Sequence, residues 1–198
     1  MTSRPINSVS RCLRSFPALL GAAVILASCG GGNGDAGAAN PESRDIDYDA
    51  ELADAPPALE RLYGQANELL EGALERFEAE LAELEGYPVV ANLWASWCGP
   101  CRNEFPYFQS QAAEHGTEVA FLGVDVEDSE DAARTFLEQL PVPYPSVSDP
   151  DREIWRELGL VGVPGTAFYG SDGELEYVKQ GEYAEEQDLA ADIERYAR

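Results

Sequence analysis

The amino-acid sequence predicts an α/β domain in which helices cover both faces of a central sheet. From residue 88 onward, short apolar runs rich in β-branched residues alternate with segments of helical periodicity. Such an alternation is typical of a sheet with helices on both sides. In addition, the stretch WCGPC, residues 97–101, lies where one apolar run changes into a helical pattern. These observations place a candidate site at the end of a buried strand.

The first 28 residues have the features of a secretory signal peptide. They contain arginines but no acidic residue, and residues 16–27 form an apolar run. A run of this length suits a signal peptide and is too short to span a bilayer unaided. It ends in LASC, residues 26–29, which resembles the lipobox of bacterial lipoproteins, whose cysteine is acylated. We therefore expect lipidation at Cys29, with an ordinary secretory signal as the alternative.

A spacer and a helical segment follow the expected lipidation site. Residues 29–55 consist mainly of Gly, Ala, Asn and acidic residues, a composition typical of a disordered linker. In residues 56–85, apolar residues recur at spacings of three and four, which indicates helix. Gly64 and Gly72 interrupt this pattern, so we predict two helices in this helical extension. We expect its apolar stripe to pack on the domain that begins at residue 86; a coiled-coil dimer is the alternative.

Residues 86–198 alternate between strand and helix patterns. The predicted strands are residues 88–94, residues 118–126, a short strand near Val147, and residues 163–169 and 175–179, the last two joined by a turn at residues 171–174. The predicted helices are residues 98–114, 129–140, 149–158 and 184–197, the second with Ser129 as its N-cap.

The two cysteines of the WCGPC stretch are predicted to form a redox-active pair. Three residues apart at the start of a helix, Cys98 and Cys101 would have Cα atoms about 5 Å apart, which a disulfide tolerates. Free amide groups at the helix start stabilise negative charge, so we expect the Cys98 thiol to ionise more readily than a free thiol. Cys98, at the tip, is then the attacking sulfur. Cys101, one turn further in, resolves the mixed disulfide.

Two other uses of this cysteine pair fit the sequence less well. A zinc site needs four ligands, and the remaining candidates are Cys12 in the signal peptide, Cys29 and the single histidine, His115. His115 lies about 20 Å from Cys101 by helical rise, so we expect no metal. A purely structural disulfide as a rule closes a longer loop, because the stabilisation grows with loop size. We expect no cofactor besides the redox-active disulfide itself.

The stretch VVANLWASWCGPCRNEFP, residues 89–106, resembles the active-site region of thioredoxin-fold proteins. It is most similar to the TlpA/ResA branch of membrane-tethered thiol–disulfide reductases. The resemblance covers residues 86–198 and includes GVPGTAFY, residues 162–169, which is similar to that family's cis-proline loop. It implies a thioredoxin fold with a mixed sheet, an inserted helix and strand at residues 129–148, and a cis bond before Pro164. The family also has short strands before residue 86, where this sequence has helical periodicity.

The same resemblance implies roles for residues around the cysteines. Ordinary thioredoxins hold a buried acid at the position of Asn92, and an amide cannot exchange a proton. Glu104 matches a carboxylate of the TlpA/ResA branch, and we expect burial to raise its pKa so that it serves as the acid–base group. The alternative is an acid that is merely favoured near a helix start. The residues expected to contact the substrate are Trp97, Gly99, Pro100, Val163 and Pro164.

The composition limits the partners of the protein. With 13 basic and 37 acidic residues, the net charge is −24, which repels nucleic acid and favours a soluble monomer. The expected function is a lipid-anchored thiol–disulfide oxidoreductase on the outer face of the cytoplasmic membrane, or a secreted or periplasmic one if Cys29 is not lipidated. The resemblance implies that it reduces protein disulfides, as in cytochrome c maturation or redox homeostasis. Because that compartment is oxidising, a membrane thiol carrier would have to supply the electrons.

Three alternative functions make different demands on the sequence. An oxidase that donates disulfides would use the same cysteines and differ in reduction potential. A thiol peroxidase would need a proline and a Ser or Thr just ahead of the cysteine, where Ala91 and Ala95 stand. A copper chaperone of related fold would need wider cysteine spacing and a later histidine. The reductase therefore remains the leading prediction.

Overall fold

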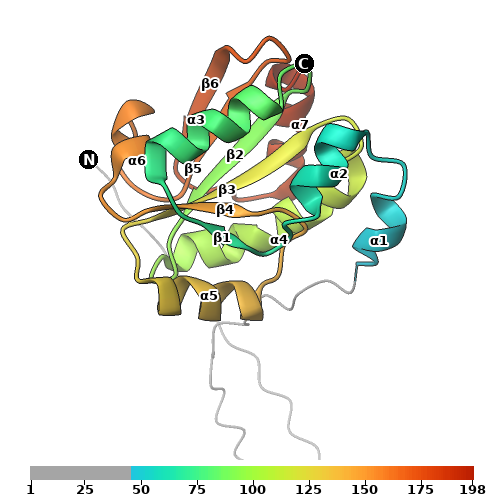
Figure 1. Ribbon diagram of the computed structural model, residues 1–198. Coiled ribbons are helices and arrows are strands. Elements are labelled where there is room, and N and C mark those ends of the chain that lie inside the picture. The colour runs from blue at the N-terminus through green and yellow to red at the C-terminus, as the bar shows by residue number, and fades with distance from the viewer. Residues whose placement is uncertain (1–45) are drawn as a thin grey trace, which may run out of the picture. The chain divides into compact units, whose positions relative to one another are not determined.

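The computed structural model describes residues 46–198, which contain a mixed six-stranded sheet flanked by helices (Figure 1). The strand order is β1-β4-β3-β2-β5-β6. The strands are β1 (Leu69–Leu70), β2 (Val89–Trp94), β3 (Ala120–Val126), β4 (Ser146–Asp149), β5 (Gly165–Tyr169) and β6 (Leu175–Gln180). The first four in this order pair in parallel, and β5 and β6 are antiparallel to their neighbours. The predicted fold class is confirmed. The expected signal peptide, Cys29 and residues 30–45 of the expected linker lie outside the described residues.

Helices cover both faces of this sheet. The helices are α1 (Tyr48–Glu51), α2 (Pro57–Tyr63), α3 (Ala73–Glu83), α4 (Gly99–His115), α5 (Glu130–Gln139), α6 (Glu153–Glu157) and α7 (Glu186–Tyr196). On one face, Phe105 of α4 and Phe136 of α5 pack against Trp94 of β2. On the same face, Tyr196 of α7 packs against Phe168 of β5. On the other face α3 places Phe77 against Tyr169 of β5. The sheet is therefore the middle layer of three.

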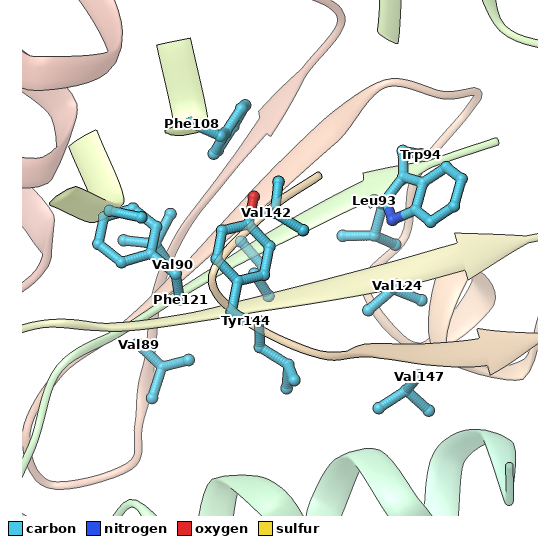
Figure 2. Close-up of a cluster of buried hydrophobic side chains, with 14 of the residues drawn as sticks. Val89, Val90, Leu93, Trp94, Phe108, Phe121, Val124, Val142, Tyr144 and Val147 are labelled. Carbon is cyan, nitrogen blue, oxygen red and sulfur yellow. The ribbon is translucent and has the colours of Figure 1, made fainter. Parts of the chain in front are cut away.

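The core forms because the central strands carry mostly apolar side chains on both faces. Every residue of β2 and of β3 is buried, as expected for parallel strands covered on both sides. Figure 2 shows the cluster of buried side chains from these strands, with Tyr144 and Phe108 packed beside them. On the α4 side, Trp94 stacks on Phe136 with ring centroids 4.7 Å apart. This packing fixes the end of β2, where the WCGPC stretch begins.

The segment before residue 86 is helical, as predicted, but it also contributes a strand. The two helices α2 and α3 are separated by β1, which pairs with β4 at the edge of the sheet. Because β1 is only two residues long, it leaves no alternating pattern in the sequence. The extension is thus part of the sheet that carries the site.

Part of the expected linker folds onto the domain, contrary to the expectation of a linker that runs to residue 55. Tyr48–Glu51 form α1, and the Asp47 side chain accepts a hydrogen bond from the Ala50 N–H at 3.2 Å. Leu52 and Ala55 pack against the core, which compensates for ordering this polar segment. The composition of this segment does not predict that Leu52 and Ala55 pack against the core.

The inserted helix and strand predicted at residues 129–148 are present as α5 and β4. Ser129 caps α5 as predicted, by accepting a hydrogen bond from the Ala132 N–H at 3.4 Å. The helix predicted at residues 149–158 is wrong at its start, since only Glu153–Glu157 are helical. Asp149 instead ends β4 and accepts hydrogen bonds from the N–H groups of Glu153 and Trp155. Asp149 therefore caps the N-terminus of α6 although it belongs to β4. An acidic residue near a helix start is also what the sequence pattern shows, so the pattern placed Asp149 in the helix.

Candidate active site

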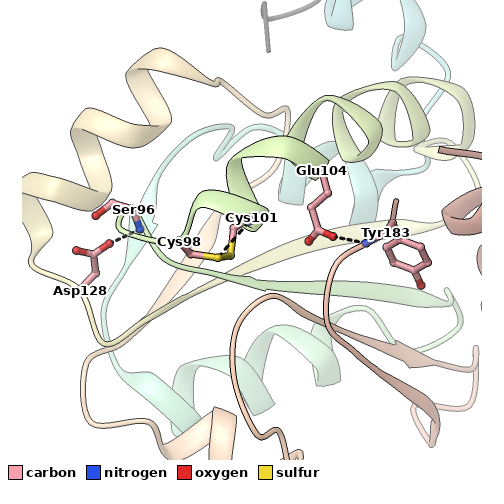
Figure 3. The surroundings of a disulfide bond; sticks show 6 residues. All are labelled: Ser96, Cys98, Cys101, Glu104, Asp128 and Tyr183. Carbon is pink, nitrogen blue, oxygen red and sulfur yellow. Dashed lines mark hydrogen bonds between the residues drawn. A yellow bond between two sulfur atoms is a disulfide. The ribbon is translucent and has the colours of Figure 1, made fainter. Parts of the chain in front are cut away.

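Cys98 and Cys101 form a disulfide at the start of α4, directly after β2 (Figure 3). Their Cα atoms are 5.3 Å apart, close to the spacing predicted for the first turn of a helix. Cys98 is the N-cap of α4, and its Sγ accepts a hydrogen bond from the Cys101 N–H at 3.1 Å. The positive end of the helix therefore points at this sulfur, as required to stabilise a thiolate.

The two sulfur atoms differ in access. Cys98 keeps 5% of its surface exposed, whereas Cys101 has none. The neighbouring residues Gly99 and Pro100 are exposed, and Trp97 is 60% exposed. A macromolecular disulfide can therefore approach Cys98 more readily than Cys101. This asymmetry suits an attacking sulfur at the rim and a resolving sulfur beneath it.

The loop before β5 lies at the same end of the sheet as the cysteines. Gly165 pairs with Leu93 of β2, so Pro164 lies level with the end of that strand. The Val163–Pro164 bond is cis, as the family resemblance implied, and Pro164 is buried. Val163 is half-buried, and within the described part of the chain neither its N–H nor its carbonyl bonds to another backbone group. These two groups can receive a substrate strand.

Glu104 is buried one turn after Cys101 on α4. Its side chain has no exposed surface, and its Oε2 accepts a hydrogen bond from the Tyr183 N–H at 2.9 Å (Figure 3). Burial raises the pKa of Glu104 to about 8, against the opposing effects of the Tyr183 N–H and of Lys179. Glu104 therefore carries its proton near neutral pH.

Asn92 occupies the buried strand position expected from the sequence. It is 1% exposed and lies two residues before Trp94 on β2. Residues two apart on a strand point to the same face, so Asn92, like Trp94, faces the α4 side of the sheet. Its amide cannot take up or release a proton. Glu104, on the helix that covers this side of the sheet, is a buried acid that can.

Several residues that shape the site are not recognisable from the sequence. The Tyr183 N–H holds Glu104, and the Lys179 Nζ, which lowers the pKa of Glu104, lies 4.5 Å from the centre of the Tyr183 ring. Asp128 accepts a hydrogen bond from the Ser96 N–H at 2.6 Å, two residues before Cys98. The two hydrogen bonds join residues more than 30 positions apart, so no local pattern predicts them.

The described residues contain neither a cluster of metal-ligating side chains nor a membrane-spanning helix. In residues 46–198, no group of three or more His, Cys, Asp or Glu side chains is arranged to hold a metal ion. No helix of the same stretch is long and apolar enough to cross a membrane.

Comparisons with known proteins point to one family. Residues 66–178, more than half of the chain, match the AhpC/TSA family. A thiol–disulfide oxidoreductase ResA from Oceanobacillus iheyensis is 32% identical over 110 residues, which cover 54% of this chain and 57% of that protein. The chain thus spans little more than half the length of this curated relative. These matches agree with the resemblance that the WCGPC and cis-proline stretches suggested.

Two solved structures are similar in fold and sequence. A putative thiol:disulfide interchange protein DsbE from Chlorobium tepidum has a TM-score of 0.55 and 27% identity, covering 58% of this chain and 83% of that one. An exposed lipoprotein thioredoxin from Streptococcus pneumoniae has a TM-score of 0.52 and 25% identity, covering 58% of this chain and 89% of that one. Both likenesses support a thioredoxin fold for this chain.

Proposed function

The chain belongs to the AhpC/TSA family, and we propose that it is a thiol–disulfide oxidoreductase that reduces protein disulfides through Cys98 and Cys101. One observation carries the proposal: a disulfide at the tip of α4, with one sulfur at the rim and a buried, protonated acid one turn behind the other. The names of the similar proteins, ResA and DsbE, support the same chemistry.

In the reductive reaction, the Cys98 thiolate attacks one sulfur of a substrate disulfide. A mixed disulfide forms, and the other substrate sulfur leaves as a thiolate that takes a proton from solvent. Cys101 then loses its proton and attacks the Cys98 sulfur, which releases the second substrate thiol. Two electrons have passed from the protein to the substrate, and the Cys98–Cys101 disulfide is closed.

Glu104 manages the proton of Cys101 in this cycle. When a donor dithiol reopens the disulfide, Cys101 becomes a thiolate in a site without solvent, and the protonated Glu104 can supply its proton. When Cys101 later attacks Cys98, the Glu104 carboxylate takes that proton back. Glu104 is therefore neutral in the oxidised protein near pH 7 and carries a negative charge after it has given its proton to Cys101.

We propose that the substrate lies across Trp97, Gly99 and Pro100 and extends along Val163 and Pro164. The first three are exposed beside Cys98, and the unbonded backbone groups of Val163 suit the addition of an extended peptide. The chain's charge of −24 disfavours acidic partners and nucleic acid. The substrates in this proposal are disulfides of other extracytoplasmic proteins.

The proposed location follows from the sequence of the undescribed N-terminus. A signal peptide at residues 1–28 and a lipidated Cys29 would hold the domain at the outer face of the cytoplasmic membrane. The similar lipoprotein thioredoxin supports this arrangement. A reductase in that oxidising compartment needs a membrane thiol carrier as its electron donor. Replacing Cys29 with Ala should move the protein from the membrane fraction to the soluble fraction; unchanged fractionation argues against a lipid anchor.

Trapping the mixed disulfide tests the proposed exchange reaction. We expect Cys101→Ser to accumulate a covalent adduct with a protein disulfide such as insulin, because the resolving sulfur is missing. The matched variant Cys98→Ser should accumulate none, since Cys101 has no exposed surface. Non-reducing electrophoresis and mass spectrometry of the adduct provide the readout. Adducts on neither variant, or equally on both, would contradict the proposal.

The reduction potential of the Cys98–Cys101 pair decides whether the protein reduces disulfides or donates them. A potential of about −270 mV, as in thioredoxin, supports the reductase. A potential of about −120 mV would instead assign the chain to the disulfide-donating oxidases. Equilibration with glutathione or dithiothreitol redox buffers, followed by thiol alkylation, measures it.

A further inference from the structure

Val161 is a large apolar side chain that the fold leaves in solvent. Within residues 46–198, the exposed large apolar side chains are Trp97 at 60%, Val161 at 86% and Leu175 at 45%. A single exposed apolar residue is common on a protein surface and by itself indicates no function. The case for Val161 depends on how the chain holds it and on where it lies relative to Cys98.

Tertiary contacts fix the loop that carries Val161. The Val161 N–H donates to Gln180 Oε1 at 3.1 Å, and the Gln180 Nε2 donates to the Gly159 carbonyl at 3.4 Å. The preceding residue, Leu160, is 4% exposed and fills the space beside Gly165 that a side chain there would take. Because Leu160 is anchored inward and the backbone on both sides is bonded, the Val161 side chain is held outward in a defined place.

The sheet register places Val161 near the strand that leads to Cys98. Gln180, at the end of β6, pairs with Gly165 of β5, which in turn pairs with Leu93 of β2. Neighbouring strands lie about 4.8 Å apart, so the residue that holds Val161 lies about 10 Å from β2. An extended peptide covers that distance in about three residues.

The two exposed side chains Trp97 and Val161 lie on either side of the cysteine pair. The Trp97 Nε1 donates to the carbonyl of Glu127, which directly follows β3, the other neighbour of β2. Val161 is two residues before Val163, whose backbone groups suit the addition of an extended peptide. A peptide that pairs with Val163 and stays extended therefore runs past Val161. Leu175 starts β6 and lies at the opposite end of that strand.

We propose that Val161 contacts an apolar side chain of the substrate, about three residues from the cysteine that forms the mixed disulfide with Cys98. Disulfides in extended segments that carry an apolar residue at this spacing are then reduced in preference to disulfides in polar segments. Val161 acts in recognition alone, and the exchange of electrons between the sulfurs is the one described above. This inference rests on the proposed function, because it names the class of disulfide that Cys98 attacks.

Two synthetic peptides test this preference. Each carries one cysteine as a mixed disulfide with thionitrobenzoate, and they differ only in having Leu or Ser at the third position on both sides of that cysteine. Attack of Cys98 on the peptide sulfur releases the coloured thiolate, so absorbance follows the reaction of the reduced protein at pH 7. We expect the wild type to react about tenfold faster with the Leu peptide, in second-order rate constant, as expected for burying one apolar side chain.

Val161→Ser should abolish this preference between the two peptides. The matched control Leu175→Ser also removes an exposed apolar side chain, at the far end of β6, and should keep the preference. Equal rates for the two peptides in the wild type, or a preference that survives in Val161→Ser, would overturn the inference. An equal loss of the preference in both variants would overturn it too.

A small disulfide separates this inference from the proposed function. The symmetric disulfide of thionitrobenzoate has no peptide chain that could reach Val161, so it reports the exchange reaction at Cys98 alone. If the reduced wild type reacts with this disulfide but shows no preference between the peptides, the inference fails and the proposed function stands. If it reacts with neither the small disulfide nor the peptides, both fail.

Discussion

Glu104 shows how burial turns an ordinary carboxyl group into a proton carrier. Its side chain is shielded from solvent in α4, and the Tyr183 N–H bonds to only one of its two oxygens. The single lysine of the sequence, Lys179, lowers the pKa of Glu104, but burial outweighs it. Glu104 is therefore protonated in the neutral pH range, in which thiols and disulfides exchange.

Replacing Glu104 with Gln should remove this proton carrier while keeping an oxygen for the Tyr183 N–H. We expect the rate of insulin reduction to fall about a hundredfold, the lower end of what general acid–base catalysis contributes. The wild-type rate should also show a pH dependence near pH 8 that the variant lacks. Steady-state assays across that pH range measure both effects. An unchanged rate and pH profile would assign Glu104 to packing alone.

Two of the buried acids, Glu104 and Asp125, should make the folded protein less stable at alkaline pH. The pKa values of Glu104 and Asp125 are raised to about 8 from 4.5 and 3.8. The folded state therefore retains protons that the unfolded state releases, and this stability is complete below about pH 4 and lost as the pH rises through 8. In urea denaturation of the oxidised protein, we expect Glu104→Gln to gain a few kcal/mol relative to wild type by about pH 9. Parallel profiles for the two proteins would contradict the raised pKa.

At the residue scale, the sequence predicts the members of the site that lie within one motif. Cys98, Cys101 and Glu104 occupy one helical face, and Pro164 stands in its own short motif. Spacing identifies the two cysteines, and the resemblance to the TlpA/ResA branch identifies Glu104 and Pro164. Tyr183 and Asp128 act through a backbone N–H and a loop carboxylate that only the tertiary structure brings to the motif. No local spacing rule contains that information.

At the element scale, a side-chain contact between β2 and β4 depends on a glycine in β3, the strand between them. The Trp94 Nε1 donates to Ser146 Oγ at 3.2 Å, and this contact passes over Gly123 of β3. A Cβ at Gly123 would overlap the Ser146 Oγ and approach the Trp94 Nε1. The absence of a side chain at this position therefore allows the indole to bond across the sheet.

Gly123→Ala should lower the free energy of unfolding by about 1–3 kcal/mol, the usual cost of overpacking a buried position. Gly162→Ala is a suitable control, because a Cβ there meets nothing within 4 Å. We expect it to change the free energy of unfolding by less than about 0.5 kcal/mol. Chemical denaturation of both variants provides the comparison. Equal stability of the two would show that the sheet adjusts freely around Gly123.

Tyr63 ties α2 to the start of β3, because its hydroxyl donates to the Val119 carbonyl at 2.8 Å in a buried position. Tyr63→Phe leaves that carbonyl without this partner and should cost about 1–3 kcal/mol. Thermal or urea unfolding measures the loss. A variant as stable as wild type would mean that the carbonyl finds another donor.

Periodicity predicts the long elements of this fold and fails for the short ones. The buried strands β2 and β3 and the helices α4, α5 and α7 have clear patterns over enough residues to be recognised. The strand β1 is too short for any pattern, and α6 is preceded by a turn that mimics a helix start. The strand β1 is determined by its tertiary pairing with β4, and α6 begins where the Asp149 carboxylate accepts the N–H groups of Glu153 and Trp155.

At the scale of the whole molecule, the excess of acidic residues favours solubility and opposes compaction. With a net charge of −24, the folded chain repels itself more than an expanded chain does. At a salt concentration of 0.1 M, exposed charges more than about 10 Å apart are largely screened from one another. We expect the unfolding midpoint to rise by about 2–4 °C between about 0.05 and 0.5 M NaCl, equivalent to roughly 1 kcal/mol. A midpoint that falls with salt would indicate that ion pairs outweigh the net repulsion.

The order in which the two thiols react with a limiting alkylating agent tests the account most directly. Cys98 lies at the helix tip with some exposed surface, and Cys101 has none. We predict that one equivalent of iodoacetamide, added to the reduced protein at pH 7, modifies Cys98 and leaves Cys101 free. Fragmentation of the labelled peptide by mass spectrometry locates the modification. Labelling of Cys101 first, or of both sulfurs equally, would contradict the assignment of attacking and resolving cysteines.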